Sequence, residues 1–305
     1  MFAVVGEALV DLVGDAGGST FVAHPGGSPA NVAIGLRRLG SPVRLVTRLG
    51  SDPFGDLVRE HLEADGVEVD PGRQQGTQTS LAIASLDSGA ATYDFRIAWD
   101  VEAIADLDAG TLALHTGSLA TALAPGSEAV LDLLRRSRGS TTISYDPNVR
   151  PSLMGAPHDA RAGVEEIVAL CDVVKVSDED LGWLYEGESD VEVARRWLAS
   201  GPALVVVTRG GDGVLGVTSG GEVERPSRTI ELADTVGAGD SFTAGLLDGL
   251  RLVGLLGAER QALAGIDDET LAGVLDRAVA ASGITCSRPG ADPPTTAELD
   301  EALAG

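Results

Sequence analysis

Residues 234–247 read Asp-Thr-Val-Gly-Ala-Gly-Asp-Ser-Phe-Thr-Ala-Gly-Leu-Leu, a glycine-rich turn at a point where a helix is expected to begin. Gly237, Ala238 and Gly239 have little side-chain bulk, so their N–H groups and those of the first helical turn can converge on one anion. Asp240 follows directly. A carboxylate repels a phosphate but can accept a proton, so the pattern predicts phosphoryl transfer with Asp240 as the general base.

A purely structural interpretation of this turn is also open. Glycine-rich turns often precede helices for packing alone, and Asp240 would then cap the helix. A bare Gly-x-Gly-Asp pattern does not decide between a cap and a base.

The chain has a net charge of −24 and a single lysine, Lys175. Such a charge repels nucleic acid and anionic membrane, so we expect small-molecule partners, no nucleic acid and no membrane. The sequence has no Gly-x-x-x-x-Gly-Lys-Ser/Thr motif, which excludes a P-loop phosphate site. A phosphate must therefore be held by backbone N–H groups, arginine or a metal ion.

The 305 residues, 44% of them hydrophobic, suffice for one large α/β domain. Without repeats or a long polar linker, we expect a single domain over residues 1–305. Cys171 and Cys286 are far apart and lack metal-ligand spacing, so we expect neither a disulfide framework nor a zinc site. We expect a cytoplasmic protein, because the first residues lack a basic signal region and no apolar run is long enough to span a membrane.

The string in residues 234–245 resembles the C-terminal signature of the ribokinase-like (PfkB) carbohydrate kinases. The resemblance covers nearly the whole chain and implies an α/β fold: a three-layer α/β/α arrangement with a central, mostly parallel sheet and a small discontinuous β lid. It implies an ATP-dependent kinase that uses Mg²⁺ and phosphorylates a small hydroxylated substrate. Asp240 would be its catalytic base, and its anion hole would consist of Gly237, Ala238 and Gly239.

The first 40 residues contain a second matching region. Residues 2–12 predict one buried strand with Asp11 near its end. Residues 25–40 predict a turn and an amphipathic helix, with Ser28 as N-cap and Gly40 at the stop. The Gly-Gly-Ser-Pro-Ala-Asn string resembles the family's N-terminal signature, which holds the sugar hydroxyl groups. The resemblance implies substrate-binding roles for four residues: Asp11, Gly26, Gly27 and Asn31.

Two segments interrupt the alternation of strands and helices. Residues 79–97 alternate in polarity around a glycine turn, a pattern typical of a β-hairpin. Residues 13–25 are glycine-rich and then strand-like. The resemblance implies that segments at about 13–25 and 77–100 form a lid over the sugar and the contact of a homodimer. We expect Arg96 to face the sugar.

Residues 141–151 end an expected strand with Asp-Pro-Asn-Val-Arg, at the edge where open α/β sheets bind ligands. Asp-Pro-Asn alone is a common turn. With Val-Arg after it, the string resembles the fructokinase and ketodeoxygluconate kinase branch of the family, where this arginine faces the substrate. Residues 6–11 point to the same branch, and Arg150 is therefore expected at the substrate.

Two regions are candidates for metal ions. The family often has Asn-x-x-Glu after a strand such as residues 173–177, where the motif helps to organise hydrated Mg²⁺. This chain has Ser177 and Asp180 there, so the amide is absent and the carboxylate is one methylene shorter; a helix dipole alone would also favour this acidic start. The resemblance further implies a monovalent cation such as K⁺ near Asp234 and Thr235.

Residues 203–216 are a β run and a glycine turn containing Gly211-x-Gly213-x-x-Gly216, nominally a dinucleotide fingerprint. The following residues predict a strand rather than the helix that a pyrophosphate site requires. The segment instead resembles the family's Thr-x-Gly-x-x-Gly pattern. That resemblance implies nucleotide-binding roles for Thr208, Gly210 and Gly213.

The sequence therefore predicts an ATP-dependent sugar kinase, with fructose as the first choice of substrate. A 2-dehydro-3-deoxygluconate kinase and a ribokinase are the alternatives within the family, because motifs do not show the shape of a sugar pocket. A nicotinamide oxidoreductase would need a helix after Gly213. A sugar-binding regulator would lose the turnover residues, and the presence of Asp240 argues against it.

Overall fold

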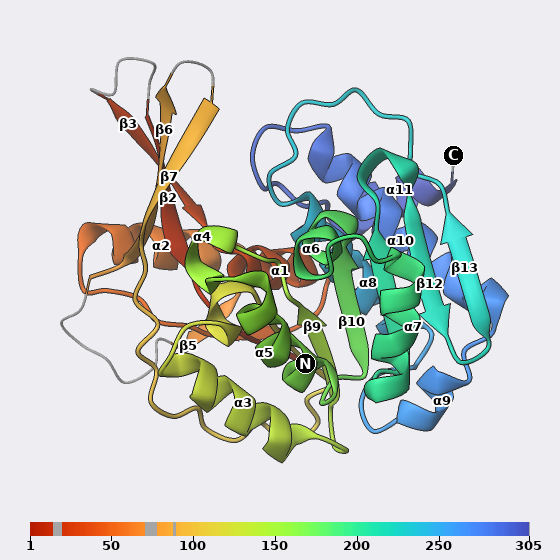
Figure 1. The fold of residues 1–305 in the computed structure, drawn as a ribbon. Coiled ribbons are helices and arrows are strands. Elements are labelled where there is room, and N and C mark those ends of the chain that lie inside the picture. The colour runs from red at the N-terminus through yellow and green to blue at the C-terminus, as the bar shows by residue number, and fades with distance from the viewer. Residues whose placement is uncertain (15–19, 71–77, 88–89, 305) are drawn as a thin grey trace.

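A nine-stranded sheet runs through the centre of the computed structural model, which describes residues 1–304 except 15–19, 71–77 and 88–89 (Figure 1). In spatial order its strands are β13 (Gly221–Arg225), β12 (Val214–Thr218), β11 (Leu204–Thr208), β10 (Val173–Ser177), β9 (Thr142–Asp146), β8 (Ala113–Gly117), β1 (Phe2–Val5), β4 (Val43–Val46) and β5 (Glu68–Asp70). Every pair from β5 to β11 is parallel, and β12 and β13 add antiparallel strands at one edge. The predicted α/β fold with a mostly parallel sheet is confirmed.

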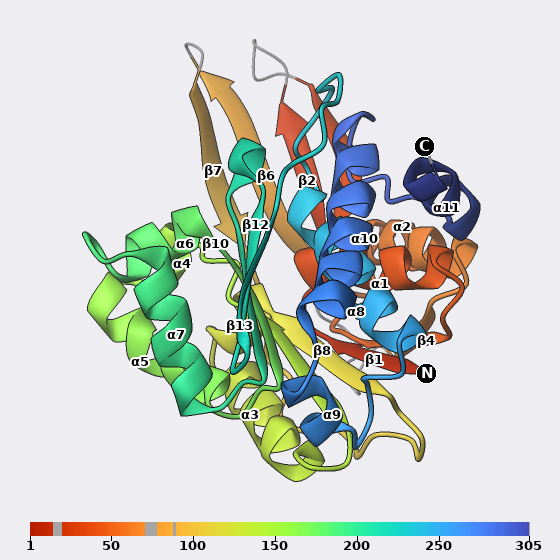
Figure 2. The same ribbon diagram turned by 90° about the vertical axis from the view of Figure 1, so that its right-hand side faces the viewer.

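Helices cover both faces of this sheet (Figure 2). One layer contains α1 (Ser28–Arg38), α2 (Pro53–Ala64), α8 (Ala238–Leu252), α9 (Arg260–Ala264), α10 (Asp268–Cys286) and α11 (Thr296–Ala304). The other contains α3 (Gly126–Ser137), α4 (Pro151–Met154), α5 (Pro157–Val168), α6 (Asp178–Leu184) and α7 (Asp190–Ser200). Two short 3₁₀ turns are η1 (Ser118–Thr121) and η2 (Gly210–Asp212).

The strands alternate between the two helix layers, which explains why they are apolar throughout. Phe2 and Val4 of β1 pack in the core beneath α1 and α8, whereas Ala3 and Val5 pack beneath α3 and α5. Successive side chains of a strand point to opposite faces, so a sheet covered on both faces buries every position.

A second sheet of four strands projects from the body at the upper left of Figure 1. Its order is β3 (Phe21–Gly26), β2 (Leu9–Gly14), β6 (Ser80–Asp87) and β7 (Ala90–Arg96). Strands β3, β6 and β7 come from the segments expected to form the lid, whereas most of β2 lies before residue 13, where the first of those segments was expected to begin. Residues 15–19, 77 and 88–89 of those segments lie outside the described residues.

The first predicted strand is wrong in extent. Residues 2–12 form two strands, β1 in the central sheet and β2 in the second sheet, separated by a bend at Gly6. A Cβ on Gly6 would overlap the ring of Pro29, so the chain turns there against the start of α1. Asp11 consequently lies in the second sheet rather than at the end of a central strand.

The predicted N-cap of α1 is also wrong by one residue. Gly27 is the cap, with a φ of 107° that favours glycine, and Ser28 is the first residue of the helix. The Ser28 hydroxyl group is therefore not used on its own helix, which frees it for the contact described below.

We predict that Gly245→Ala in α8 lowers the melting temperature. A Cβ at Gly245 would lie 2.9 Å from both the Cα of Ala278 and the Cβ of Ala281 in α10, so the two helices would have to separate. Overpacking typically costs roughly 1–3 kcal/mol and outweighs the gain of up to about 1 kcal/mol in helix propensity.

Gly273→Ala in α10 is the matched control for this substitution. A Cβ at Gly273 meets no atom within 4 Å, so the change should raise the melting temperature slightly. Equal effects of the two substitutions in thermal denaturation would contradict the packing argument.

Candidate active site

The N-terminus of α8 carries the glycine-rich turn. Gly237 is the N-cap residue with a left-handed φ of 74°, and a Cβ there would lie 2.6 Å from the Cβ of Ala291. The first N–H groups of a helix have no partner within it. Among the described residues, the N–H groups of Gly239 and Asp240 have no backbone acceptor. The turn therefore offers free donors to an anion.

Asp240 is the third residue of α8 and is 8% exposed. Its Oδ1 accepts a hydrogen bond from Ser28 Oγ at 2.6 Å, and its Oδ2 accepts one from Asn31 Nδ2 at 2.8 Å. Burial raises the pKa of Asp240, and these two hydrogen bonds partly offset the rise. The carboxylate is held by side chains of α1, and the cap position belongs to Gly237, so the interpretation of Asp240 as a helix cap is wrong.

Asp11 lies on β2, an inner strand of the second sheet, and the charge of Asp240 acts on it. Its pKa is raised by burial and lowered by the charge of His24, which is its direct partner on β3. A Cβ on Gly26 would overlap the Asp11 carboxylate, and one on Gly27 would lie 2.6 Å from the carbonyl oxygen of Glu7. Gly26 thus permits a close approach of the chain to Asp11, and Gly27 permits one to the backbone of Glu7.

A buried ion pair lies behind the glycine-rich turn, and the sequence analysis did not predict it as part of the site. Lys175 Nζ of β10 donates to Asp146 Oδ2 of β9 at 2.9 Å, and the two side chains are 6% and 2% exposed. Asp180 accepts the N–H of Val149 at 3.1 Å, and burial followed by the charge of Asp146 raises the pKa of Asp180 to about 6. The sequence signal that could have indicated this ion pair is the single lysine of the chain, which lies within an apolar strand.

The two candidate arginines lie in different places. Arg150 is half-buried, donates to Asn148 Oδ1 at 2.7 Å, and its charge acts on both Glu7 and Asp11. Arg96 is exposed at the end of β7 and pairs with Asp94. Arg96 is opposite Leu81 and Val10 in the register, so it lies on the other face of the sheet from Asp11. The structure brings Arg150, and not Arg96, to the Asp240 side.

The expected nucleotide-binding residues lie at the end of β11. Thr208 is its last residue, and Gly210 and Gly213 have φ values of 50° and 97°. The chain continues from Gly213 into β12, so no helix follows the Gly211 fingerprint. A nicotinamide oxidoreductase would need a helix at this place, so the structure argues against that function.

Asp234 joins two loops beside the turn. Its Oδ2 accepts the N–H of Gly290 at 2.8 Å, its Oδ1 accepts the N–H of Val236 at 3.1 Å, and these bonds lower its pKa. The carbonyl oxygen of Thr235 accepts the N–H of Ala238 at 3.2 Å. The expected cation region is thus an ordered loop pair.

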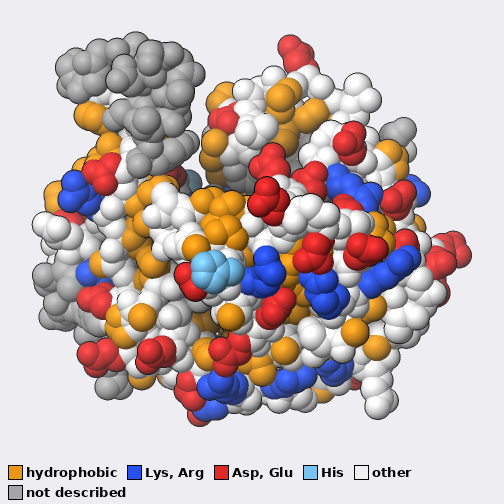
Figure 3. Space-filling model, viewed as in Figure 1, with side chains coloured by type: hydrophobic (Ala, Val, Ile, Leu, Met, Phe, Trp, Pro, Cys, Tyr) orange, Lys and Arg blue, Asp and Glu red, His pale blue; other side chains and the backbone are white. Residues whose placement is uncertain are grey.

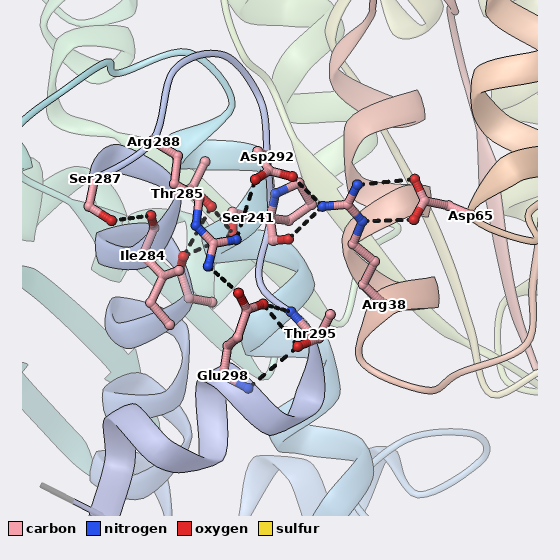
Figure 4. Close-up of polar contacts among 12 residues, drawn as sticks. Arg38, Asp65, Ser241, Ile284, Thr285, Ser287, Arg288, Asp292, Thr295 and Glu298 are labelled. Atoms are coloured by element: carbon pink, nitrogen blue, oxygen red, sulfur yellow. Dashed lines mark hydrogen bonds and ion pairs between the residues drawn. The ribbon is translucent and has the colours of Figure 1, made fainter.

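An ionic network fastens that C-terminal loop to α1 (Figure 4). Arg38, the last residue of α1, donates through Nε to Asp65 at 2.8 Å and through Nη1 to Asp292. Arg288 contacts both Asp292 and Glu298. The loop beside Asp234 is therefore tied to the helix that positions Asp240.

The described part of the chain contains no group of three or more His, Cys, Asp or Glu side chains placed to hold a metal ion. None of its described helices has the length and apolar content needed to cross a membrane. On the face in Figure 3, acidic and basic side chains are intermingled.

Residues 1–298 match the pfkB family of carbohydrate kinases. The chain belongs to this family. A fructokinase of Rhizobium leguminosarum bv. trifolii is 36% identical over 267 residues, which are 84% of this chain and 81% of that protein.

Solved structures agree with this family assignment. The crystal structure of fructokinase from Xylella fastidiosa with bound ATP has a TM-score of 0.88 and 26% identity, covering 99% of this chain and 98% of that one. A fructokinase double mutant from Vibrio cholerae O395 with fructose, ADP and potassium has a TM-score of 0.81 and 26% identity, with coverages of 99% and 98%. The ribokinase-like fold of this pfkB carbohydrate kinase is therefore confirmed.

Glu7 is a further buried acid in this pfkB kinase, between β1 and β2. It is 3% exposed and accepts the N–H of Ala120 at 3.2 Å. Burial raises its pKa from 4.5 to about 7, despite a hydrogen bond from Ser118 and the charge of Arg150. The folded protein therefore favours protonated Glu7, a stabilising contribution that is complete below pH 4.5 and is lost as the pH rises to about 7.

We predict that Glu7→Gln becomes more stable relative to the wild type as the pH rises from 4.5 to 8. Glutamine keeps the acceptor oxygen but never bears a charge, so the difference in unfolding free energy should grow by up to about 3 kcal/mol, at about 1.4 kcal/mol per pKa unit. Urea denaturation across this pH range measures it. Glu60→Gln on the exposed side of α2 is the control, and a pH-independent difference for Glu7→Gln would contradict the prediction.

Proposed function

We propose that this protein is an ATP-dependent fructokinase, which transfers the γ-phosphate of ATP to a hydroxyl group of fructose. The observation that carries the proposal is the buried Asp240 carboxylate, which Ser28 and Asn31 hold beside the free N–H groups of Gly239 and Asp240. The similarity to fructokinases supports the choice of sugar. The 2-dehydro-3-deoxygluconate and ribose kinases are the alternatives.

In the proposed reaction Asp240 accepts the proton of the attacking sugar hydroxyl group. Its raised pKa makes it a stronger base than an exposed aspartate, yet the hydrogen bonds from Ser28 and Asn31 favour its ionised form. The N–H groups of the 237–239 turn face the charge that develops on the transferring phosphoryl group. Asp11 and Asn31 orient the sugar, with Arg150 beside them.

We propose ATP with Mg²⁺ as the phosphoryl donor. A single carboxylate together with triphosphate oxygens and water suits Mg²⁺, and Asp180 offers such a carboxylate at the end of the central sheet, beside Asp146. Mg²⁺ would neutralise charge on the phosphates.

The nucleotide would be contacted by Thr208, Gly210 and Gly213. Potassium occurs in a fructokinase structure similar to this chain, so we assign the region of Asp234 and Thr235 to a monovalent cation.

We further propose a single kinase domain over residues 1–305, in which the second sheet closes over the sugar as a lid. Val13, Phe21 and Val22 of that sheet are exposed, which supports a homodimer formed through the lid. A cytoplasmic location is consistent with two free cysteines, Cys171 and Cys286.

A coupled ADP-release assay over fructose, ribose, 2-dehydro-3-deoxygluconate, nucleosides and sugar phosphates tests the proposed function. Fructose should have the largest kcat/KM. A larger value for another sugar would reassign the substrate, and no ADP release with any of them would contradict the kinase assignment for this set of acceptors.

We predict that Asp240→Asn lowers kcat by about 10²- to 10⁴-fold, the usual cost of losing a general base. The fold should persist, because asparagine can still accept the Ser28 hydrogen bond and removes a charge whose burial is unfavourable. Fructose affinity should change little. Steady-state kinetics, sugar titration calorimetry and a thermal melt measure these three effects.

Asp248→Asn is the matched control on the same helix. Asp248 is fully buried but pairs with Arg251 and Arg277 away from the turn. This variant should melt at a lower temperature while the folded enzyme keeps its kcat. A folded Asp240→Asn enzyme with nearly normal kcat would refute the base assignment.

A further inference from the structure

The only lysine of the chain is buried directly behind the glycine-rich turn. Lys175 lies on β10, and its ammonium group would be 3.0 Å from a Cβ built on Gly239. Val173 belongs to the core beneath α8, whereas Val174 and Val176 belong to the opposite core. Because strand positions alternate, Lys175 points with Val173 toward α8. The positive charge of Lys175 therefore lies next to Gly239, on the inner side of the glycine-rich turn.

The surroundings of Lys175 contain more negative than positive charge. Asp146 pairs with it at 2.9 Å, and the charges of Asp180 and Asp240 also act on it. Burial lowers the pKa of Lys175, but the charge and hydrogen bond of Asp146 outweigh this and raise it, so the amine stays protonated. One ammonium group thus stands among three carboxylates.

A triphosphate entering this place would meet strong repulsion without a buried cation. Backbone N–H groups alone offer partial charges to the phosphoryl group, whereas the carboxylates carry full charges. An ammonium group is a compact charge that suits this position under a turn whose largest side chain is the methyl group of Ala238. The chain has no second lysine to replace it.

We propose that Lys175 is a positioning residue for phosphoryl transfer: its ammonium group, nearer to Gly239 than the Asp146 and Asp180 carboxylates, places positive charge directly behind the 237–239 turn, so that the turn can accept the charge of the transferring group. This inference rests on the proposed kinase function. In the reaction the sugar oxygen bonds to the γ-phosphorus, the bond from that phosphorus to the β,γ-bridging oxygen breaks, and the sugar proton moves to Asp240. Lys175 keeps its protons throughout.

The rival explanation is that Lys175 only neutralises Asp146 so that the protein can fold. The two explanations differ for a double substitution. Asp146→Asn combined with Lys175→Met removes both charges, and it restores charge balance within the pair without restoring a cation behind the turn. A folding role predicts recovery of activity, whereas the positioning role predicts recovery of stability alone.

We predict that Lys175→Met lowers both the melting temperature and kcat. In the double variant the melting temperature should return toward the wild-type value, while kcat stays lowered by about 10²- to 10³-fold, the cost of losing one stabilising donor of this kind. Lys175→Arg, which keeps the charge, should retain more activity than Lys175→Met. If the single variant fails to fold, the double variant carries the test.

Arg277→Met is the matched control, because Arg277 forms a buried ion pair with Asp248 at 2.7 Å away from the turn. It should lower the melting temperature and leave kcat unchanged in the folded enzyme. A double variant of Lys175 and Asp146 with wild-type kcat would overturn the inference.

Wild-type ADP release with fructose tests the proposed function separately. If the wild type turns over no sugar, calorimetric titration with ATP and with ADP still tests Lys175. The double variant should lose more affinity for ATP than for ADP, because only ATP places a γ-phosphate at the turn. Equal losses for the two nucleotides would overturn the inference, whatever the substrate of the kinase.

Discussion

Two hydrogen bonds to the Asp240 carboxylate join helices that are more than 200 residues apart in sequence, one from Ser28 and one from Asn31. The proposed base, Asp240, belongs to α8 and its two donors belong to α1, so the geometry of the site depends on how closely these helices pack. A Cβ on Gly35 of α1 would lie 2.7 Å from the Cβ of Ala244 of α8. Glycine at this crossing allows the approach on which both hydrogen bonds depend.

The same helix also reaches the other side of the site. The first turn of α1 holds Asp240, while Arg38 at its last turn holds the C-terminal loop through Asp292 (Figure 4). That loop donates the Gly290 N–H to Asp234, close to the glycine-rich turn. One helix therefore fixes both the proposed base and the loop beside the proposed cation region, which suits a reaction that needs an in-line arrangement of two substrates.

The electrostatics of the site follow from burying acids in a chain of net charge −24. Burial raises the pKa of Glu7, Asp180 and Asp240 because a charge is costly away from water. A phosphate can approach only if donors and cations compensate. Free N–H groups at the start of α8, the ammonium group of Lys175 and the guanidinium group of Arg150 provide that compensation within the protein.

Local patterns in the sequence determined the α/β fold, the turn before α8, Asp240 itself and the absence of a helix after Gly213, because each depends on neighbouring residues and their backbone preferences. Tertiary structure decided that the first strand divides at Gly6, that Ser28 binds Asp240 instead of capping α1, and that Lys175 pairs with Asp146 behind Gly239. It also put Arg96 on the far face of the second sheet. Strand register and helix packing join residues distant in sequence, and such pairings leave no periodicity in the chain from which they could be predicted.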